Sequence, residues 1–449
     1  MNARRKRQLL ISQELQRIDG AAPDARPVLA KHIKMAASPF QFLRGASQLF
    51  YADLSVGTFS LPSVLLEVPL TRIVGDCHLA NFGFLTENGS YGDTVIWAPN
   101  DYDDAAAGHA AFDLMRFCVS LFLVADFLEG LVAGRYRNEK KFKNTTHPTR
   151  KDAEGASKRF LKSYRKTLGQ IVKDTDKRDE ALKRFTSGHF LRKPIQKAQA
   201  RSAGGKHFKK KSSVAKLTRR TAAGFRFDPS SDKLAKVSPD LAGELRQVFG
   251  PHFDDDVLDV ARRIGAGTGS LSVERYYFLV GPDAAPDAET FRETHVVEVK
   301  QQREAAVIHH FPDLSPVNRM NPAHLTVDCQ RRMMRRPDLV LDEVVWSGLH
   351  WLVRSRHHAR LTVDTEDLLR TGKPAKALKD YAEACGVTLA RTHSRGDRRS
   401  VRFERAMASA LKATRKDLIA IARRYAAQTR RDHALLLKMI GADGDAHAA

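Results

Sequence analysis

The stretch Gly75-Asp76-Cys77-His78-Leu79-Ala80-Asn81 carries an acid and an amide with four residues between them, and Asn100-Asp101-Tyr102-Asp103-Asp104 follows after a hairpin-like segment. Between the two stretches, the apolar run Thr94-Val95-Ile96-Trp97 predicts a strand that leads into Asp101. Short polar side chains hydrogen-bond the nearby backbone, so either stretch alone is typical of a turn. The whole string is harder to explain as turns, because Asp101-Tyr102-Asp103-Asp104-Ala105 is followed by Gly108 and then by Ala111-Phe112-Asp113-Leu114.

The first stretch resembles the catalytic loop of protein kinases, in which an acid takes the proton of the acceptor hydroxyl and an amide holds magnesium. The resemblance implies that Asp76 is catalytic and that Asn81 is both catalytic and a metal ligand. The second stretch, which continues into Phe112-Asp113-Leu114, resembles the metal-binding segment of aminoglycoside and choline phosphotransferases. It implies that Asp101 and Asp103 bind Mg²⁺. His78 is a further candidate for contact with substrate or phosphate.

A glycine-rich stretch, Ile264-Gly265-Ala266-Gly267-Thr268-Gly269-Ser270, lies far downstream. Strand-like runs follow it at Val273–Val280 and Val296–Lys300. Glycine lets backbone N–H groups approach a phosphate without an obstructing Cβ, and a lysine at the end of a strand can neutralise the phosphates. The pattern therefore predicts an ATP site made by Gly265, Gly267, Gly269, Ser270 and Lys300.

The chain beyond Lys300 has the remaining parts of a kinase amino-terminal lobe. A predicted helix at His324–Met334 carries Asp328, which is the candidate partner of Lys300 in the nucleotide site, with Glu304 as its rival. A hairpin follows between Leu339 and Val353. These parts come after the catalytic loop, whereas in kinases they precede it. We therefore expect an α+β, two-lobed, kinase-like fold that is circularly permuted, which a chain tolerates when its old termini lie close together.

The chain also resembles one bacterial family, the domain of unknown function 2252 family. The resemblance covers most of the sequence and rests on the motifs S-P-F-Q-F-L-R-G (38–45), G-D-C-H-L-A-N-F-G (75–83), N-D-Y-D-D (100–104), F-D-L-M-R (112–116), G-A-G-T-G-S (265–270), V-E-V-K (297–300), D-C-Q-R (328–331) and Y-A-A-Q-T-R-R-D-H (425–433). The family has no activity that the resemblance could transfer. It implies that the two half-sites belong to one unit.

The predicted organisation has four parts. Residues 1–135 hold the catalytic loop and metal segment of the large lobe, and residues 136–250 form a basic, partly helical insertion or linker. Residues 251–356 form the small nucleotide-binding lobe, and residues 357–449 form the helical remainder of the large lobe. In that remainder, Thr392-His393-Ser394-Arg395-Gly396-Asp397 predicts a polar turn between helices, with a substrate contact through His393 and Asp397 as the alternative.

The composition is typical of a globular protein, with 42% hydrophobic and 28% charged residues in 449. Cys77, Cys118, Cys329 and Cys385 have no metal-ligand or C-x-x-C spacing and predict reduced cytoplasmic thiols. The apolar run Phe117–Val132 contains two acids, which favours a buried helix over a membrane span. The amino terminus lacks an apolar stretch long enough for a secretory signal.

The net charge of +23 is concentrated between Arg135 and Lys236, above all at Lys206–Lys216. Such a run is either a solvated surface or an attraction for an anionic partner, such as nucleic acid, an acidic membrane surface or a phosphorylated substrate. Aromatic residues are sparse there, which argues against a stacking platform for single strands. Arg44 has two interpretations as well. It is either a buried ion-pair partner of Asp53 or Asp113, or a contact to the donor phosphates.

These patterns predict a phosphotransferase that uses ATP and Mg²⁺ and acts on an unknown hydroxyl acceptor, with an anionic acceptor as one option. A nucleotide-binding pseudokinase or a nucleotidyltransferase is the first alternative. A basic nucleic-acid-binding protein with structural acids is the second.

Overall fold

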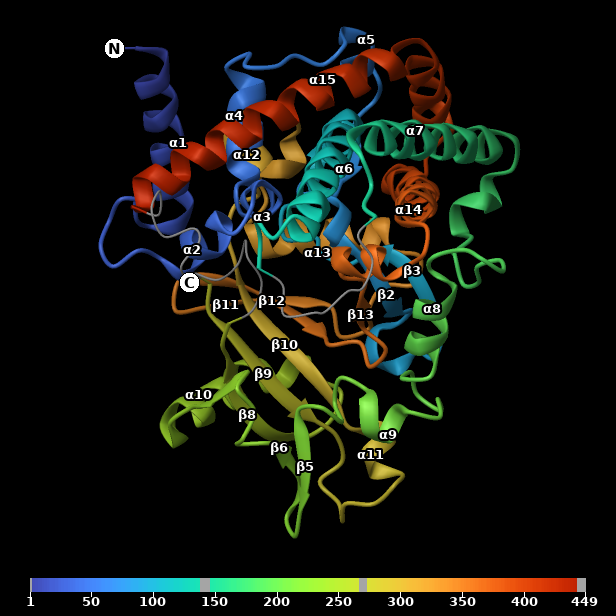
Figure 1. Ribbon diagram of the computed structural model, residues 1–449. Coiled ribbons are helices and arrows are strands. Elements are labelled where there is room, and N and C mark those ends of the chain that lie inside the picture. Colours follow the sequence, from blue (N-terminus) through green and yellow to red (C-terminus); the bar gives the residue numbers. More distant parts are fainter. Residues whose placement is uncertain (1, 138–145, 266–272, 442–449) are drawn as a thin grey trace.

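The computed structural model describes residues 2–137, 146–265 and 273–441 (Figure 1). Within these ranges the protein is a mixed α+β structure with a helical carboxy-terminal part. The helices are α1 (Ala3–Asp19), α2 (Ala30–Ala36), α3 (Pro39–Gly45), α4 (Ser47–Ser55), α5 (Ser63–Leu66), α6 (Ala110–Val132), α7 (Arg150–Lys173), α8 (Arg192–Gln199), α9 (Phe208–Lys211), α10 (Pro239–Phe249), α11 (Thr290–Glu293), α12 (Ala306–His310), α13 (Pro322–Met333), α14 (Pro374–Gly396) and α15 (Arg402–Ile440). The strands are β1 (Thr71–Ile73), β2 (Phe82–Thr86), β3 (Val95–Pro99), β4 (Ala106–Gly108), β5 (Thr218–Thr221), β6 (Gly224–Phe227), β7 (Leu234–Lys236), β8 (Val257–Arg263), β9 (Arg275–Val280), β10 (His295–Gln302), β11 (Asp342–Trp346), β12 (Leu349–Ser355) and β13 (Leu361–Thr362).

A six-stranded antiparallel sheet forms one end of the molecule, with the strand order β11-β12-β10-β9-β8-β7 (Figure 1). In β10, Val297 and Val299 belong to a core that includes Phe249 of α10 and Trp351 of β12. Side chains alternate between the two faces of a strand, so Lys300 lies on the face opposite to these valines. The lysine is therefore directed toward the rest of the protein and away from the α10 core.

The helical part surrounds α6, which is apolar on nearly every side and almost completely buried. α7, α14 and α15 pack around it at the other end of the molecule (Figure 1). The buried helix expected at Phe117–Val132 is thus confirmed. None of the described helices is long and apolar enough to cross a membrane.

Two small sheets connect the helical part to the six-stranded sheet. β2 pairs with β3 and, on its other edge, with β13, where Leu361 lies opposite Phe84. β13 follows β12 after only a few residues, so the chain leaves the six-stranded sheet and immediately joins the sheet beside the Asp76 segment. β1 pairs with β4, which brings the residues before Asp76 next to those after Asp104.

Most elements expected from periodicity are present, including β3, β9, β10, α13 and the β11–β12 hairpin. The turn predicted at Thr392–Asp397 is wrong for Thr392–Gly396, because these residues continue α14, and Asp397 caps that helix. Gly396 is required there by packing, since a Cβ would collide with the side chain of Thr71. The four cysteines are buried and unpaired, as the sequence predicts.

The basic stretch Lys206–Lys216 packs against the six-stranded sheet. Phe208, Val214 and Leu217 enter a small core with residues of β8, β9 and β10. The lysines between these anchors remain exposed on the short helix α9.

Candidate active site

The Asp76 loop (residues 75–81) is fixed at its start by a buried carboxylate. Asp113, in the first turn of α6, accepts the main-chain N–H groups of Val74 and Gly75 at 2.7 and 3.0 Å. Gly75 has a φ of 81°, and a Cβ there would overlap the main chain of Asp104. The sequence therefore needs glycine at the position just before Asp76.

Asp113 is held in turn by two side chains from distant helices. His393 of α14 places Nε2 3.0 Å from Oδ2 of Asp113, and the hydroxyl of Tyr164 lies 2.7 Å from Nδ1 of His393. All three side chains are buried. His393 thus supports the Asp76 loop from behind, while Asp397 ends α14 and binds Arg399. Neither residue lines the pocket at Asp76, so the substrate contact considered for them is wrong.

Asp76 is a partly buried carboxylate with one direct cationic partner. Nε of Arg116, on α6, lies 2.6 Å from Oδ1 of Asp76. Burial raises the pKa of Asp76 to about 6, although Arg116 acts in the opposite direction. A carboxylate with this pKa accepts a proton well near neutral pH. His78 lies beside it, with Nε2 3.5 Å from Oδ2, and burial lowers the pKa of its imidazole well below the usual range.

Asn81 closes the Asp76 loop. Its side-chain amide donates to the main-chain carbonyl of Asp76 at 2.7 Å, and this orientation leaves the amide oxygen for another partner. The residue lies on a 3₁₀ turn, Leu79–Asn81, directly before β2. The amide oxygen therefore has the position and chemistry of a ligand for a hard cation.

The Asp101 loop (residues 100–104) follows β3 and lies against the Asp76 loop. Asp104 anchors it by accepting the N–H of Ala306 at 2.9 Å and the hydroxyl of Ser47 at 3.1 Å. The N–H of Asp103 bonds to Oδ1 of Asp101 at 3.3 Å. Oδ1 of Asp103 is buried and has no hydrogen-bond partner among the described residues. This loop therefore presents a carboxylate oxygen that lacks a donor or cation.

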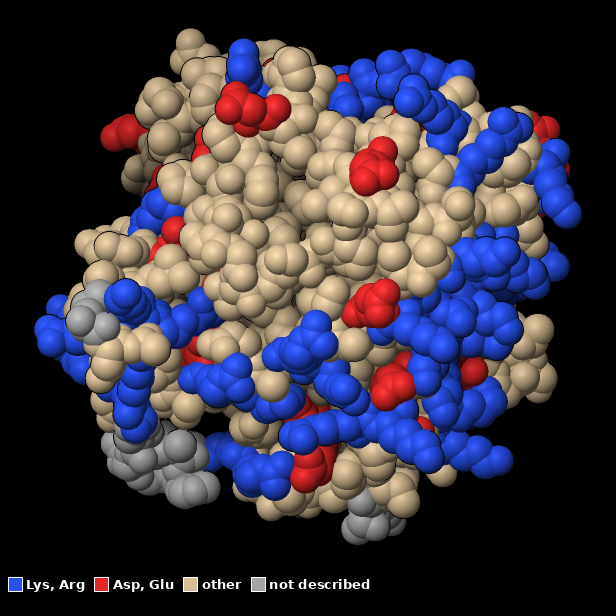
Figure 2. All heavy atoms as spheres, turned by 90° about the horizontal axis from the view of Figure 1, so that it is seen from above, with Lys and Arg blue, Asp and Glu red and all other residues tan. Residues whose placement is uncertain are grey.

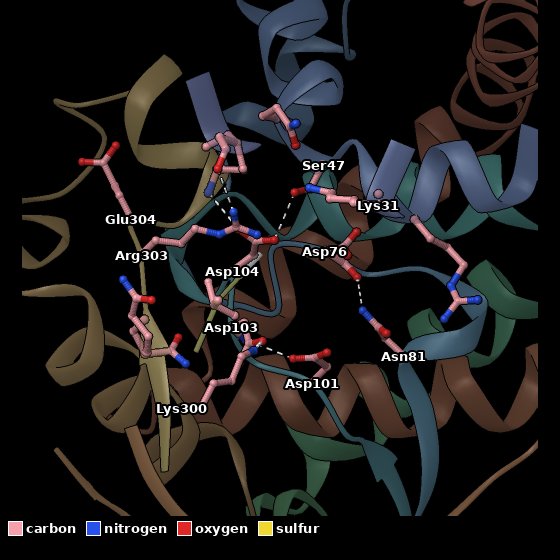
Figure 3. Close-up of a pocket in the computed structure, with 18 of the residues that line it drawn as sticks. Lys31, Ser47, Asp76, Asn81, Asp101, Asp103, Asp104, Lys300, Arg303 and Glu304 are labelled. Carbon is pink, nitrogen blue, oxygen red and sulfur yellow. Dashed lines mark hydrogen bonds and ion pairs between the residues drawn. The ribbon is translucent and has the colours of Figure 1, made fainter. Parts of the chain in front are cut away.

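Lys300 reaches the Asp101 loop from β10 and forms an ion pair with Asp103 (Figure 3). Burial lowers the pKa of the Lys300 ammonium to about 7, against the charge of Asp101. Lys300, Asp101 and Asp103 line the same pocket as Asp76 and Asn81. Lys300 and Asp103 are 197 residues apart in the sequence, and the fold brings them into contact. One shared cleft requires such a contact.

The predicted partner of Lys300 on α13 is wrong. Asp328 accepts from Nε of Arg72 at 3.0 Å and from Nε of Arg332 at 2.7 Å, and it does not line the pocket. This turn of α13 faces β1, so its carboxylate meets the arginine of that strand. The rival Glu304 does line the pocket but forms no ion pair with Lys300 among the described residues.

The glycine-rich stretch is described only in part. Gly265 is exposed, has a φ of 67° and does not line the pocket. Gly267, Gly269 and Ser270 lie outside the described residues. Val273, where the description resumes, does line the pocket.

Arg44 lines the pocket without either of its expected partners. Asp53 instead binds Arg7 and accepts from the hydroxyl of Tyr425 at 2.6 Å, whereas Asp113 caps the Asp76 loop. Arg44 donates from Nη1 to Gln41 at 2.9 Å, and its Nε is buried without a hydrogen-bond partner. Burial lowers the pKa of this guanidinium, against the attraction of Asp76. The buried ion pair expected for Arg44 is therefore wrong, and its charge faces the pocket acids.

Several further residues line the pocket without having been singled out in the sequence, and the polar ones among them include Lys31, Ser47, Gln48 and Arg303. They come from α2, α4 and the end of β10, and no local pattern marks them. Lys31 is buried, with Nζ 2.6 Å from Asp19. Burial lowers the pKa of its ammonium. Arg116 differs from these residues, because it belongs to the F-D-L-M-R motif quoted from the sequence. No role was predicted for this arginine, which pairs with Asp76.

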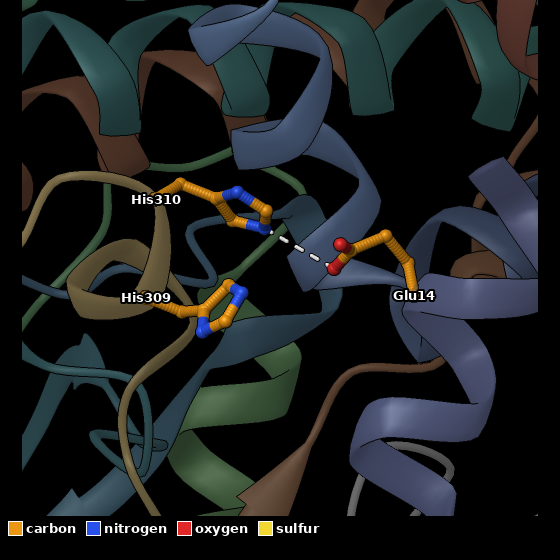
Figure 4. A group of neighbouring side chains, drawn as sticks. All are labelled: Glu14, His309 and His310. Atoms are coloured by element: carbon orange, nitrogen blue, oxygen red, sulfur yellow. Dashed lines mark hydrogen bonds and ion pairs between the residues drawn. The ribbon is translucent and has the colours of Figure 1, made fainter.

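A separate group of potential metal ligands joins α1 to α12, where Glu14 lies beside His309 and His310 (Figure 4). Nε2 of His310 is 3.1 Å from Oε2 of Glu14, and Nη2 of Arg17 is 2.7 Å from the same oxygen. The two bases lower the pKa of Glu14 against the effect of its burial. Because a guanidinium already compensates this carboxylate, we interpret the group as an ion-pair network that fastens α1 to α12.

Comparison with protein families assigns the chain. Residues 24–439 match the model of the family described as uncharacterized protein conserved in bacteria (DUF2252), and the chain belongs to that family. No curated protein and no solved structure matches the chain. The family resemblance seen in the sequence motifs is thereby confirmed.

Proposed function

We propose that this protein is a kinase-like phosphotransferase with its two lobes in permuted order, which transfers the terminal phosphoryl group of magnesium ATP to a hydroxyl acceptor. The observation that carries the proposal is the meeting of Lys300 with Asp101 and Asp103 beside Asp76 and Asn81. One metal-bound triphosphate has to touch a lysine, a metal-binding acid and a catalytic loop at once. All three kinds of group line this one pocket.

The order of elements in the six-stranded sheet supports a kinase-like small lobe. β8 and β9 flank the glycine-rich stretch, β10 carries Lys300, α13 follows, and the β11–β12 hairpin closes the lobe. After β12, the chain joins the edge of β2 through β13, directly beside the Asp76 loop. In an unpermuted chain, this is where the small lobe would continue into the catalytic loop. The connection therefore supports a circular permutation.

The residues at the pocket fit a nucleotide and a magnesium ion. Oδ1 of Asp103 and Nε of Arg44 are both buried without hydrogen-bond partners. A cation satisfies the first group and a phosphate oxygen satisfies the second. Mg²⁺ in such sites takes only one or two carboxylates, and phosphate oxygens complete its coordination. Asp101 and Asp103, with the amide oxygen of Asn81, are the ligands we assign. The cavity that these residues line has a volume of about 110 Å³.

Each group then has a defined part in the reaction. A metal ion held by Asp101, Asp103 and Asn81 would supply positive charge at the donor phosphates. Asp76 orients the acceptor hydroxyl and takes its proton as the oxygen bonds to the γ-phosphorus. The bond from that phosphorus to the β–γ bridging oxygen breaks, and ADP leaves. Lys300 holds the donor phosphates. To do so, its ammonium group leaves the carboxylate of Asp103 and binds phosphate oxygens.

Calorimetric titration with magnesium ATP tests this assignment without knowledge of the acceptor. Lys300→Ala removes a charged contact to the phosphates, so we expect affinity to fall about ten- to hundredfold. Asp76→Ala is expected to leave affinity within about twofold while phosphoryl transfer to water or to the protein itself falls about 10²–10⁴-fold. The matched control is Asp328→Ala, which removes a carboxylate outside the pocket.

The possible outcomes separate the candidate classes. Tight binding with no transfer in the wild type, and no change in Asp76→Ala, indicates a nucleotide-binding pseudoenzyme. Release of pyrophosphate instead of ADP indicates nucleotidyl transfer. Equal affinity for ATP in the wild type and Lys300→Ala contradicts the proposed nucleotide site.

A further inference from the structure

Two long helices carry more than half of the net charge of +23. α7 has eight lysines and arginines against two acids, and α15 has ten against three. The two helices lie against each other at the end of the molecule opposite the six-stranded sheet (Figure 1). α7 lies within the basic segment singled out in the sequence, and α15 adds a second basic helix outside that segment.

The cations of α7 form a stripe along one side of the helix. The exposed lysines are spaced by 7, 4, 4 and 7 residues, at positions Lys151, Lys158, Lys162, Lys166 and Lys173. With 3.6 residues per turn, this spacing places all five on one face over a length of about 33 Å. Lys162, Lys166 and Lys173 form no ion pair within the part of the chain that the structure describes. Their charges are therefore available to a partner.

A second stripe runs along α15. Arg405, Lys412, Lys416 and Arg423 are exposed and share one face, because they are spaced by 7, 4 and 7 residues. The two stripes adjoin at Glu154 of α7. Lys158 lowers the pKa of this carboxylate most, and the charge of Arg423 contributes as well.

Figure 2 looks down on this end of the molecule and shows lysine and arginine gathered over one side, with few acids among them. The structure thus combines two adjoining rows of cations on two rigid helices. We infer that the α7–α15 face, defined by the two stripes, binds the phosphate backbone of double-stranded nucleic acid without reading its sequence. A duplex presents about one negative charge per 1.7 Å of its axis, so cations spaced along about 33 Å meet phosphates throughout the stripe.

The other polyanions fit this face less well. An anionic membrane surface is normally joined by apolar side chains that enter the lipid, but no large apolar residue of α7 or α15 is among the exposed ones. Single strands are held by aromatic stacking, and the aromatic residues of these helices are buried: Phe160, Tyr164, Phe403 and Tyr425. A rigid row of cations without stacking groups favours a duplex.

The test compares two triple variants of the full chain that lose the same charge. Lys158→Gln, Lys162→Gln and Lys166→Gln remove three cations from the α7 stripe, whereas Lys209→Gln, Lys210→Gln and Lys211→Gln remove three exposed cations from α9. The probes are two fluorescein-labelled 24-base-pair duplexes of unrelated sequence, read by anisotropy from 50 to 200 mM salt. We expect the α7 variant to bind both at least tenfold more weakly and to lose about one unit of salt slope for each phosphate contact removed.

The α9 variant is expected to stay within about twofold of the wild type at each salt concentration. Thermal unfolding confirms that both variants fold. Equal losses in the two variants would show that net charge alone matters, and the assignment of this face would be overturned. It would also be overturned if the wild type showed no salt-dependent duplex binding, or if it preferred single strands or phosphatidylserine vesicles. The α7 residues lie outside the pocket. The duplex-binding result therefore does not depend on whether the protein binds ATP.

Discussion

The Asp76 loop is held by main-chain hydrogen bonds to a buried carboxylate, whereas Lys300 meets the Asp101 loop through an ion pair between side chains. On the first side, Asp113 is braced by His393 and cannot shift without leaving buried N–H groups unpaired. On the second side, Oδ1 of Asp103 has no hydrogen-bond partner among the described residues. The difference defines a fixed side at Asp76 and, under the proposed function, an adjustable side at Lys300.

The largest expected effect comes from breaking the fixed side. Asp113→Ala leaves the N–H groups of Val74 and Gly75 buried without an acceptor, at a cost of about 1–3 kcal/mol each. We therefore expect the free energy of unfolding to fall by about 2–6 kcal/mol, measured by urea denaturation. His393→Ala, which removes only the brace of Asp113, serves as the milder comparison. Wild-type stability in Asp113→Ala would contradict a loop fixed by this carboxylate.

The pH dependence of phosphoryl transfer tests whether ionised Asp76 is the base. The pKa of Asp76 is raised to about 6, so the fraction of ionised base falls about tenfold per pH unit below that value. With saturating magnesium ATP, the rate is expected to rise from pH 5 through pH 6 and to level off near pH 7. The rate of ADP formation at each pH gives the profile. A rate that is constant between pH 5 and pH 7 would remove Asp76 as the proton acceptor.

On the adjustable side, the measurable quantity is proton uptake by Lys300 when ATP binds. Burial lowers the pKa of Lys300 to about 7, so at pH 8 most of the free protein carries a neutral lysine. Phosphate oxygens beside the amine favour its charged form and raise this pKa, so binding takes up a proton. We expect uptake approaching one proton at pH 8 and little at pH 6. Calorimetry in two buffers with different ionisation enthalpies measures it.

Lys300→Arg is the control for this uptake, because a guanidinium stays charged at both pH values. The variant is expected to bind ATP with no proton uptake from this position. Uptake that persists in Lys300→Arg would assign the proton to another group.

The smallest effect is expected at the acid that the sequence placed wrongly. Asp328 is partly exposed and pairs with Arg72 and Arg332 outside the pocket. Asp328→Ala is therefore expected to change the free energy of unfolding by about 1 kcal/mol or less and to leave ATP affinity unchanged. Urea denaturation and calorimetry measure the two quantities. A tenfold loss of ATP affinity would restore Asp328 as a partner of the nucleotide site.

The sequence by itself determined the local elements. The run before Asp101, the alternation in β10 and the period of α13 predicted their strands and helix, because side-chain periodicity is a property of a few neighbouring residues. The sequence also identified most of the acids that line the pocket and, of the lysines there, Lys300 but not Lys31. It misplaced the turn at Thr392–Gly396, because polar residues and glycine in a buried helix look like a turn until their partners are known.

Only the tertiary structure decided which side chains meet. It paired Lys300 with Asp103 instead of Asp328 and left Arg44 facing the pocket acids. It also brought α15 beside α7, so that two separate rows of cations form one surface. The physical reason is that partners far apart in the chain are chosen by how helices and strands pack, and no spacing within the sequence records that choice.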